Sequence, residues 1–245
     1  MKVSIVIPVL NQIAFLKECL ESIEATVPDG MDVTVRIIDS ASTEPIKALA
    51  LSGVLKKAWC VYSRLEKNFG VTIPWNVGLS HAMDAGADVI CISNSDVVYG
   101  PKVIEHCALV AAERGACFPR SIQGGPKPKD FDQQAAERAK RPVMDSLVDT
   151  GGFAGWCFWL SRTTVEKIGV FDEQFQLWFS DTDYHWRLLA AGLPPLQVEA
   201  ALLHHYESRT IVSLPGQFQH QGWIAQDTDL FDRKYKRGKY ANATV

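Results

Sequence analysis

The first 120 residues alternate between short apolar runs and longer segments in which apolar residues recur at helical spacing. The apolar runs predict strands at Val3–Ile7, Val33–Ile38, Trp59–Tyr62 and Asp88–Ile92. Helices are predicted from Asn11, as the N-cap, to Thr26, from about Pro45, over Pro74–Ala85 and from Pro101. Strands and helices that alternate in this way predict parallel strands in a doubly wound α/β sheet flanked by helices.

The pattern changes after residue 120. Ser121–Arg141 is rich in Gly, Pro, Lys and Gln, which predicts an exposed, mobile loop that has room for a short helix. Beyond it, helices are predicted near Thr163–Ile168 and over Asp181–Ala191, and a strand over Leu196–Leu203. We therefore expect one domain whose second half differs from the first in composition and in the pattern of its strands and helices.

Composition is that of an ordinary globular protein. The 245 residues are 47% hydrophobic and 22% charged, and the net charge of −3 is too small for a protein that coats nucleic acid. No apolar run approaches the roughly 20 residues that span a bilayer, and the opening residues do not resemble a signal peptide. The six cysteines are dispersed without metal-binding spacing, which predicts buried free thiols and a reducing, cytoplasmic setting.

Polar residues follow the second and fourth predicted strands, at the edge where doubly wound sheets bind ligands. Asp39 follows the second strand, and Asn94-Ser95-Asp96 follows the fourth. The carboxylate of Asp96 can hold a hard divalent cation, although Asn-Ser-Asp is also a common turn. Asp39 can equally contact a ligand or cap a helix.

Two further clusters contain titratable residues. Asp181 and Asp183 open a predicted helix, where one of them can be a general base or both can simply complement the helix dipole. His204 and His205 directly follow a predicted strand. Either histidine can ligate a metal or contact a phosphate, and the alternative is one buried and one solvated side chain.

Glycine, tryptophan and basic residues give weaker indications of binding sites. Gly155 allows a ligand to approach the backbone closely or lets a strand bend. Trp156, Trp159 and Trp178 can stack on sugar rings or pack in the core. Arg233–Lys239 holds five basic residues in seven, which suit an anionic membrane surface, a nucleic-acid acceptor or a solvated chain end.

The order of these motifs resembles that of family 2 glycosyltransferases over residues 2 to 210, with the rhamnosyltransferase-like branch most similar. The segments that carry the resemblance are Val3–Asn11, Leu16–Ile23, Asn68-x-Gly70, Asn76-x-Gly78, Ala85–Asp96, Gly155–Arg162, Ile168–Glu173, Asp181-x-Asp183 and Arg187–Leu193. The chain departs from the family pattern at Ser40, Asn94 and Ser180, each of which stands where the family has an acid. The resemblance implies a GT-A fold with a Rossmann-like mixed sheet. It also implies an inverting transfer of a sugar from a UDP- or dTDP-type nucleotide sugar to a hydroxyl acceptor.

The resemblance further implies roles for individual residues. The residues expected at the nucleotide sugar are Pro8, Asn11, Asp39, Asn68, Asn94 and Ser95. The expected ligands of Mg²⁺ or Mn²⁺ are Asp96 and one of His204 and His205. Asp181 is expected to be the catalytic base, with Asp183 as the other candidate. The residues expected at the acceptor are Gly155, Trp156 and Asp183.

The expected parts of the chain follow from these roles. They are a nucleotide-sugar-binding half at 1–120, a mobile loop region at 121–150, an acceptor and catalytic half at 151–215, and a helical, basic tail at 216–245. The acceptor stays open between a glycan, a lipid-linked molecule and a nucleic acid, and a peripheral contact with the inner membrane face is a further option. The alternatives are a non-catalytic homologue that binds a nucleotide sugar or glycan, and a nucleotidyltransferase. A nucleotidyltransferase would need a Gly-rich phosphate loop, which Pro8–Asn11 does not provide.

Overall fold

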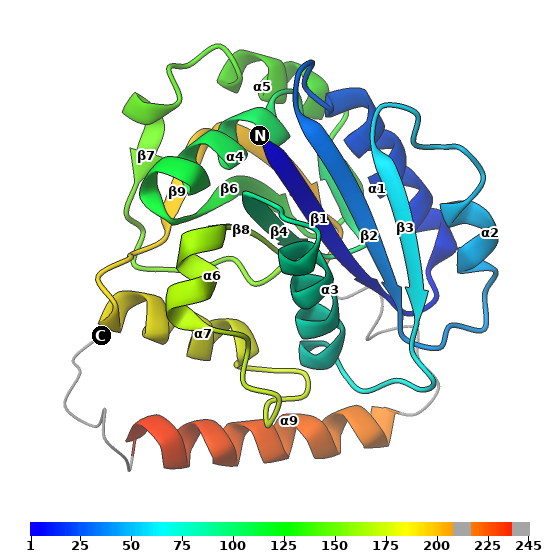
Figure 1. The fold of residues 1–245 in the computed structure, drawn as a ribbon, viewed down its shortest axis with the longest axis vertical. Coiled ribbons are helices and arrows are strands. Elements are labelled where there is room, and N and C mark those ends of the chain that lie inside the picture. Colours follow the sequence, from blue (N-terminus) through cyan, green and yellow to red (C-terminus); the bar gives the residue numbers. More distant parts are fainter. Residues whose placement is uncertain (208–216, 237–245) are drawn as a thin grey trace.

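The computed structural model describes residues 1–207 and 217–236. Within them, nine strands form one sheet in the order β3-β2-β1-β4-β8-β6-β9-β5, and β7 pairs with β9 (Figure 1). The strands are β1 (Lys2–Val9), β2 (Asp32–Asp39), β3 (Trp59–Arg64), β4 (Val89–Ser93), β5 (Val97–Tyr99), β6 (Ala116–Gln123), β7 (Leu147–Val148), β8 (Cys157–Ser161) and β9 (Leu196–His205). The helices are α1 (Ile13–Thr26), α2 (Ile46–Ala50), α3 (Thr72–Asp84), α4 (Val103–Arg114), α5 (Phe131–Arg138), α6 (Arg162–Ile168), α7 (Ser180–Ala190) and α9 (Gln217–Phe231), with short turns η1 (Met144–Ser146) and η2 (Asp232–Lys236).

The sheet is mixed, as expected. Strands β3, β2, β1 and β4 are parallel to one another, whereas β8 is antiparallel to both β4 and β6. The expected parallel half therefore ends at β4. The prediction of a doubly wound mixed sheet flanked by helices is confirmed.

Alternation along the central strands divides the core into two layers. In β1, Val3, Ile5 and Ile7 pack with α1, α2 and α4 on one face of the sheet, whereas Val6 packs with α3, α6 and α7 on the other. This follows from the period of two in a strand, which sends successive side chains to opposite faces. Both faces are covered, which explains why these strands read as nearly continuous apolar runs.

The start of α1 differs from the predicted one. Asn11 does not cap the helix; its side-chain oxygen accepts a hydrogen bond from the Thr43 backbone N–H, at 2.8 Å. The carboxylate of Glu44 instead accepts from the backbone N–H groups of Gln12 and Ile13, at 3.1 and 2.7 Å. Helix N-termini attract anions because their first N–H groups lack partners within the helix. At α1 the protein's own carboxylate occupies this position.

The Asn76-x-Gly78 motif holds α3 in place. The Asn76 side chain accepts a hydrogen bond from the Phe171 backbone N–H at 2.9 Å and donates to the Phe171 carbonyl at 3.0 Å. Gly78 lies against β1, where a Cβ atom would overlap with the side chain of Val6. Both residues of this motif therefore serve packing between α3 and its neighbours.

We expect Gly78→Val to lower the free energy of unfolding by about 2 to 3 kcal/mol, because the added side chain overpacks the contact with Val6. Urea denaturation checks this value. Ser80→Val is the matched control, since Ser80 is exposed on the same helix. Equal losses of stability in the two variants would contradict the packing role of Gly78.

Several elements in the middle of the chain were not predicted. The segment Ser121–Arg141, predicted as an exposed loop with room for a short helix, contains the short helix α5 and also the end of β6, which was not predicted. Helix α5 buries Phe131 and Ala135 against β5 and β9, and its other residues are mostly polar, so its apolar pattern is weak. All five side chains of β8 are buried, so this strand shows no alternation.

Two other predictions concern the whole chain. All six cysteines are free thiols, as expected. Among the described residues, none of the helices is both long enough and apolar enough to cross a membrane.

Candidate functional site

A cavity of about 470 Å³ opens where β1, β2 and β4 end. Nine of the predicted site residues line it: Pro8, Asn68, Asn94, Ser95, Asp96, Gly155, Trp156, Asp181 and His205. The four that do not line it are Asn11, Asp39, Asp183 and His204. The cavity therefore lies at the edge where the rule for doubly wound sheets places a ligand, at the carboxyl ends of the strands.

Strand pairing brings Asp96 and His205 together at one corner of the cavity. Strand β5 pairs antiparallel with β9, with Val97 opposite His205, and the Tyr206 N–H donates to the Asp96 carbonyl at 3.0 Å. As a result, Asp96 Oδ1 lies 3.4 Å from His205 Nε2. The indole of Trp156 stacks on the His205 ring, with 5.4 Å between the ring centroids, and fixes its plane.

The Asp96–His205 pair fits one divalent cation. Two ligands at adjacent octahedral positions, each about 2.1 Å from the ion, lie about 3.0 Å apart, which is close to the observed separation. The Asn94 amide points to the same corner, 3.5 Å from His205 Nε2. Residues 1–207 and 217–236 contain no group of three or more His, Cys, Asp or Glu side chains that could hold a metal by themselves. Ligand or water oxygens would therefore complete the coordination.

His204 lies on the opposite face of β9 and does not reach the cavity. Its ring packs against the rings of Phe131 and Tyr206, at centroid distances of 6.3 and 4.6 Å. Burial lowers the pKa of His204 and favours the neutral ring. The expectation that either histidine could ligate the metal is thus corrected, because the register of β9 directs only His205 into the cavity.

Asp181 enters the cavity from the first turn of α7, next to Gly155. A Cβ atom at Gly155 would overlap with the Asp181 carboxylate, so the glycine provides the space that this side chain occupies. Asp181 Oδ1 accepts a hydrogen bond from the Thr182 N–H at 2.8 Å. Burial raises the pKa of Asp181 above its usual value, despite hydrogen bonds from Thr182 that lower it. A carboxylate of raised pKa at a cavity is suited to accept a proton.

The raised pKa gives a testable pH dependence. In a reaction that uses Asp181 as its base, we expect kcat at saturating substrate to fall on the acid side at a pH above the usual aspartate pKa of about 3.9. The rate is lost as the pH falls through the raised pKa, because only the ionised Asp181 accepts a proton. A pH–rate profile checks this, and a kcat that stays constant down to pH 4 would contradict it.

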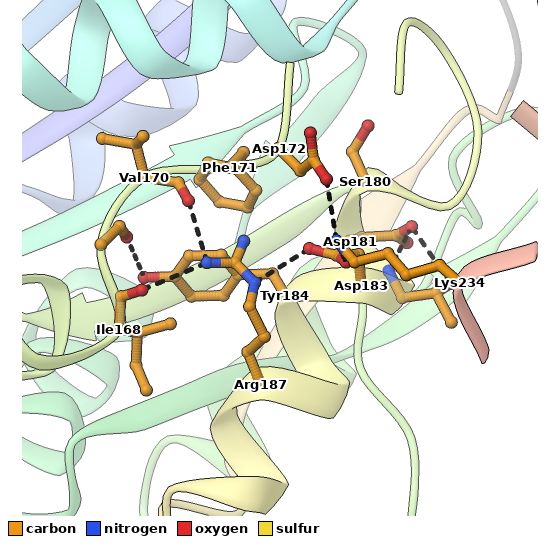
Figure 2. Close-up of polar contacts among 12 residues, drawn as sticks. Ile168, Val170, Phe171, Asp172, Ser180, Asp181, Asp183, Tyr184, Arg187 and Lys234 are labelled. Carbon is orange, nitrogen blue, oxygen red and sulfur yellow. Dashed lines mark hydrogen bonds and ion pairs between the residues drawn. The ribbon is translucent and has the colours of Figure 1, made fainter. Parts of the chain in front are cut away.

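Asp183 lies outside the cavity lining and anchors neighbouring elements. Its buried carboxylate accepts from Arg187 Nε at 2.9 Å and pairs with Lys234 Nζ at 2.5 Å (Figure 2). It also accepts from the Tyr235 hydroxyl at 2.5 Å. Lys234 also pairs with Asp172 at 2.8 Å. Asp183 therefore docks the C-terminal turn η2 onto α7, and its carboxylate is turned to these partners and not to the cavity where the acceptor was expected.

The contacts of Lys234 also show where one residue of the predicted basic tail lies. Lys234 belongs to this tail, and its ammonium group is held between the carboxylates of Asp172 and Asp183. The end of the tail, from residue 237, lies outside the described residues.

Asp39 is fully buried beside the cavity. It accepts hydrogen bonds from the Tyr62 hydroxyl at 2.6 Å and the Ser42 N–H at 2.8 Å, and it pairs with Arg64 at 2.7 Å. Burial opposes its ionisation, but these hydrogen bonds and the charge of Arg64 outweigh burial and lower the pKa of Asp39. Ser40, the next residue, lines the cavity.

Asn68 and Gly70 join the two halves of the site. The Asn68 side chain accepts a hydrogen bond from the Gly70 N–H at 2.9 Å, and the Val71 N–H donates to the Gln176 carbonyl at 2.7 Å. Gly70 has a φ of +87°, and a Cβ atom there would overlap with the Gln176 backbone. This turn therefore requires glycine, and it fixes the segment that leads into α7.

Sequence reasoning missed the contribution of α9. Trp223 of this helix lines the cavity, as do Leu177 and Trp178 of the segment before α7. The buried carboxylate of Asp227 holds that segment through its backbone N–H groups. No local pattern marks Asp227, which lies in a polar helix about 50 residues from its partners.

Comparison with known proteins gives the family and the fold. Residues 4–169 match the family described as Glycosyl transferase family 2. The crystal structure of GalNAc-T7 with UDP, GalNAc and Mn²⁺ is similar, with a TM-score of 0.64 and 16% identity, over 84% of this chain and 44% of that one. The crystal structure of S. aureus TarS 1-349 has a TM-score of 0.61 and 15% identity, over 100% of this chain and 76% of that one.

At these identities the two structures show the fold alone, and they confirm the expected GT-A fold. This chain spans less than half of the GalNAc-T7 chain. No curated protein sequence matches it.

Proposed function

This chain belongs to glycosyl transferase family 2, and we propose that it transfers a sugar from a UDP- or dTDP-type nucleotide sugar to a hydroxyl acceptor, with inversion at the anomeric carbon. The observation that carries this proposal is the position of two groups in one cavity. The Asp96–His205 pair lies at one corner, and Asp181 enters from a different element, α7. A metal site and a base that come from separate segments can act on opposite faces of one sugar.

Charge supports a metal-assisted reaction. The described residues that line the cavity include the carboxylates of Asp96 and Asp181 and neither Lys nor Arg. A nucleoside diphosphate would add further negative charge, and the N-terminus of α1 already holds the carboxylate of Glu44. We therefore place the diphosphate at the Asp96–His205 corner, where these two residues would hold Mg²⁺ or Mn²⁺. The bound cation would neutralise the negative charge that develops on the leaving diphosphate.

Asp181 would act on the acceptor. A hydroxyl is a weak nucleophile until a base takes its proton. In the proposed reaction the acceptor oxygen bonds to the anomeric carbon while the bond from that carbon to the phosphate oxygen breaks. The hydroxyl proton goes to Asp181, and the nucleoside diphosphate leaves with the bonding electron pair. Attack opposite the leaving group inverts the configuration.

A thermal-shift panel tests the proposed donor and metal. A ligand that binds only the folded protein raises the midpoint of unfolding. We expect a UDP- or dTDP-sugar to raise it with Mn²⁺ and to have little effect with a chelator, while Mn²⁺ alone gives a smaller shift. GDP-sugars serve as the comparison. Equal shifts with and without Mn²⁺, or none with any nucleotide sugar, would contradict the proposed donor site.

A further inference from the structure

Helix α9 lies across the molecule near the edge where β1, β2 and β3 end (Figure 1). The carboxylate of Asp227, fully buried on this helix, accepts three backbone hydrogen bonds. The N–H groups of Gln176, Leu177 and Trp178 donate to it at 3.0, 2.8 and 2.8 Å. Three charge-assisted hydrogen bonds from consecutive residues fix the backbone of this segment around one side chain.

The segment held by Asp227 forms part of the cavity wall. Leu177 and Trp178 both line the cavity, and Asp181 follows three residues after Trp178. Trp178 is 47% exposed, although it carries a large aromatic ring. An exposed aromatic ring at a site offers a flat apolar surface on which the apolar face of a sugar ring can pack.

The charges of the cavity restrict what can lie on this surface. The described residues of the lining include neither Lys nor Arg, and the Asp181 carboxylate lies near Trp178 in the chain. An anionic acceptor would be repelled by this carboxylate and would find no cation among those residues. An uncharged sugar avoids both costs.

We propose that Asp227 is a positioning residue, through which α9 fixes residues 176–178 and presents the indole of Trp178 as a stacking surface for an uncharged sugar of the acceptor. This inference rests on the function proposed above. It assigns α9 to the acceptor side of the site, so that its loss impairs acceptor use and spares donor binding.

Two variants and one control test the inference. Asp227→Asn keeps the shape of the side chain but turns one acceptor oxygen into an N–H₂ donor that faces N–H donors. Trp178→Ala removes the exposed indole and leaves the three hydrogen bonds to Asp227 in place. Asp229→Asn is the matched control, because Asp229 lies on the same helix, is exposed and pairs only with Arg233 among the ion pairs of the described residues.

Three measurements on the full chain separate the possible outcomes. Hydrogen–deuterium exchange at residues 176–178 reports the positioning directly. Calorimetry with a nucleotide sugar and Mn²⁺ reports donor affinity. Release of nucleoside diphosphate is followed with water alone, with methyl glycosides of glucose, galactose, rhamnose and N-acetylglucosamine, and with glucose 6-phosphate and galactose 6-phosphate as charged probes.

We expect Asp227→Asn to speed exchange at residues 177 and 178 at least tenfold and to lower kcat/KM for the methyl glycosides at least tenfold. Trp178→Ala should also lower kcat/KM for the methyl glycosides at least tenfold, by raising their KM. Hydrogen–deuterium exchange at the segment should not become faster in this variant. In both variants the donor Kd should stay within twofold, and Asp229→Asn should match the wild type in all three measurements.

Several outcomes would overturn the inference. One is that hydrogen–deuterium exchange at residues 176–178 is unchanged in Asp227→Asn. Another is that only the phosphorylated sugars, or none of the sugars, speed the release of nucleoside diphosphate by the wild type. The third is that either variant loses as much donor affinity as kcat/KM. Failure of the proposed function looks different, because the wild type would then neither bind a nucleotide sugar nor release nucleoside diphosphate to water.

Discussion

Asp181→Asn is expected to reduce sugar transfer by about 10³-fold and to change the affinity for the nucleotide sugar by less than twofold. The amide has nearly the same shape as the carboxylate but cannot accept the acceptor proton, and a general base contributes about 10² to 10⁴ in rate. Because Asp181 belongs to α7 and is not one of the two proposed metal ligands, Asp96 and His205, donor binding should persist. Transfer rate and donor Kd are measured on the same preparation.

Asp183→Asn is the matched comparison, two residues along the same helix. Asp183 faces Arg187, Lys234 and Tyr235, so its amide variant should lower the midpoint of unfolding and leave most of the activity per folded molecule. A loss of donor affinity in Asp181→Asn as large as the loss of rate would remove Asp181 from the role of base. An inactive but stable Asp183→Asn would transfer the role to Asp183.

Asp96→Ala and His205→Ala are each expected to weaken Mn²⁺-dependent binding of the nucleotide sugar by at least about 100-fold. Even the residues that only orient metal ligands are worth about 10- to 100-fold in affinity, and here a ligand itself is removed. Binding measured with a chelator should differ little from that of the wild type. Calorimetric titration of the nucleotide sugar, with and without Mn²⁺, gives the required values.

His204→Ala provides the control for this pair. His204 is the neighbour of His205 in the chain but packs against Phe131 and Tyr206 on the other face of β9. The variant should keep the metal dependence of the wild type, although its stability should fall because a buried ring is lost. An unchanged Mn²⁺ titration in His205→Ala would contradict the proposed metal site.

The strands of the first half are predictable because their apolar residues are local and continuous. Strands β1, β2 and β4 are largely buried on both faces, whereas the edge strand β3 is partly exposed. All four are short runs bounded by polar turns, so apolar runs and turn residues suffice to find them. Strand β8 is also fully buried, but it lies between a Gly-rich turn and a helix, outside the regular alternation of strands and helices in the first 120 residues. Helix α5 has only two buried residues, Phe131 and Ala135, and a polar remainder.

The site shows the same division between local and long-range information. Asp96 is found because it follows a strand whose place in the sheet is predictable. Asp181 is found because it opens a predicted helix and matches an acidic position of the family. To decide whether His204 or His205 faces the cavity as a candidate metal ligand, one must know the register of β9. To decide between Asp181 and Asp183 as the candidate base, one must know which side chains contact α7. Asp227 acts on residues about 50 positions away, and its role depends on where α9 lies in the folded chain.

The measurement that tests the central claim most directly follows the anomeric carbon of the nucleotide sugar by NMR during a single turnover with Mn²⁺. The account predicts Mn²⁺-dependent cleavage of the bond to the diphosphate and a first product of inverted configuration, with both lost in Asp181→Asn. Cleavage with retained configuration would contradict the roles given to Asp181 and to the cavity. Tight binding of the nucleotide sugar without cleavage would instead show a non-catalytic binding protein.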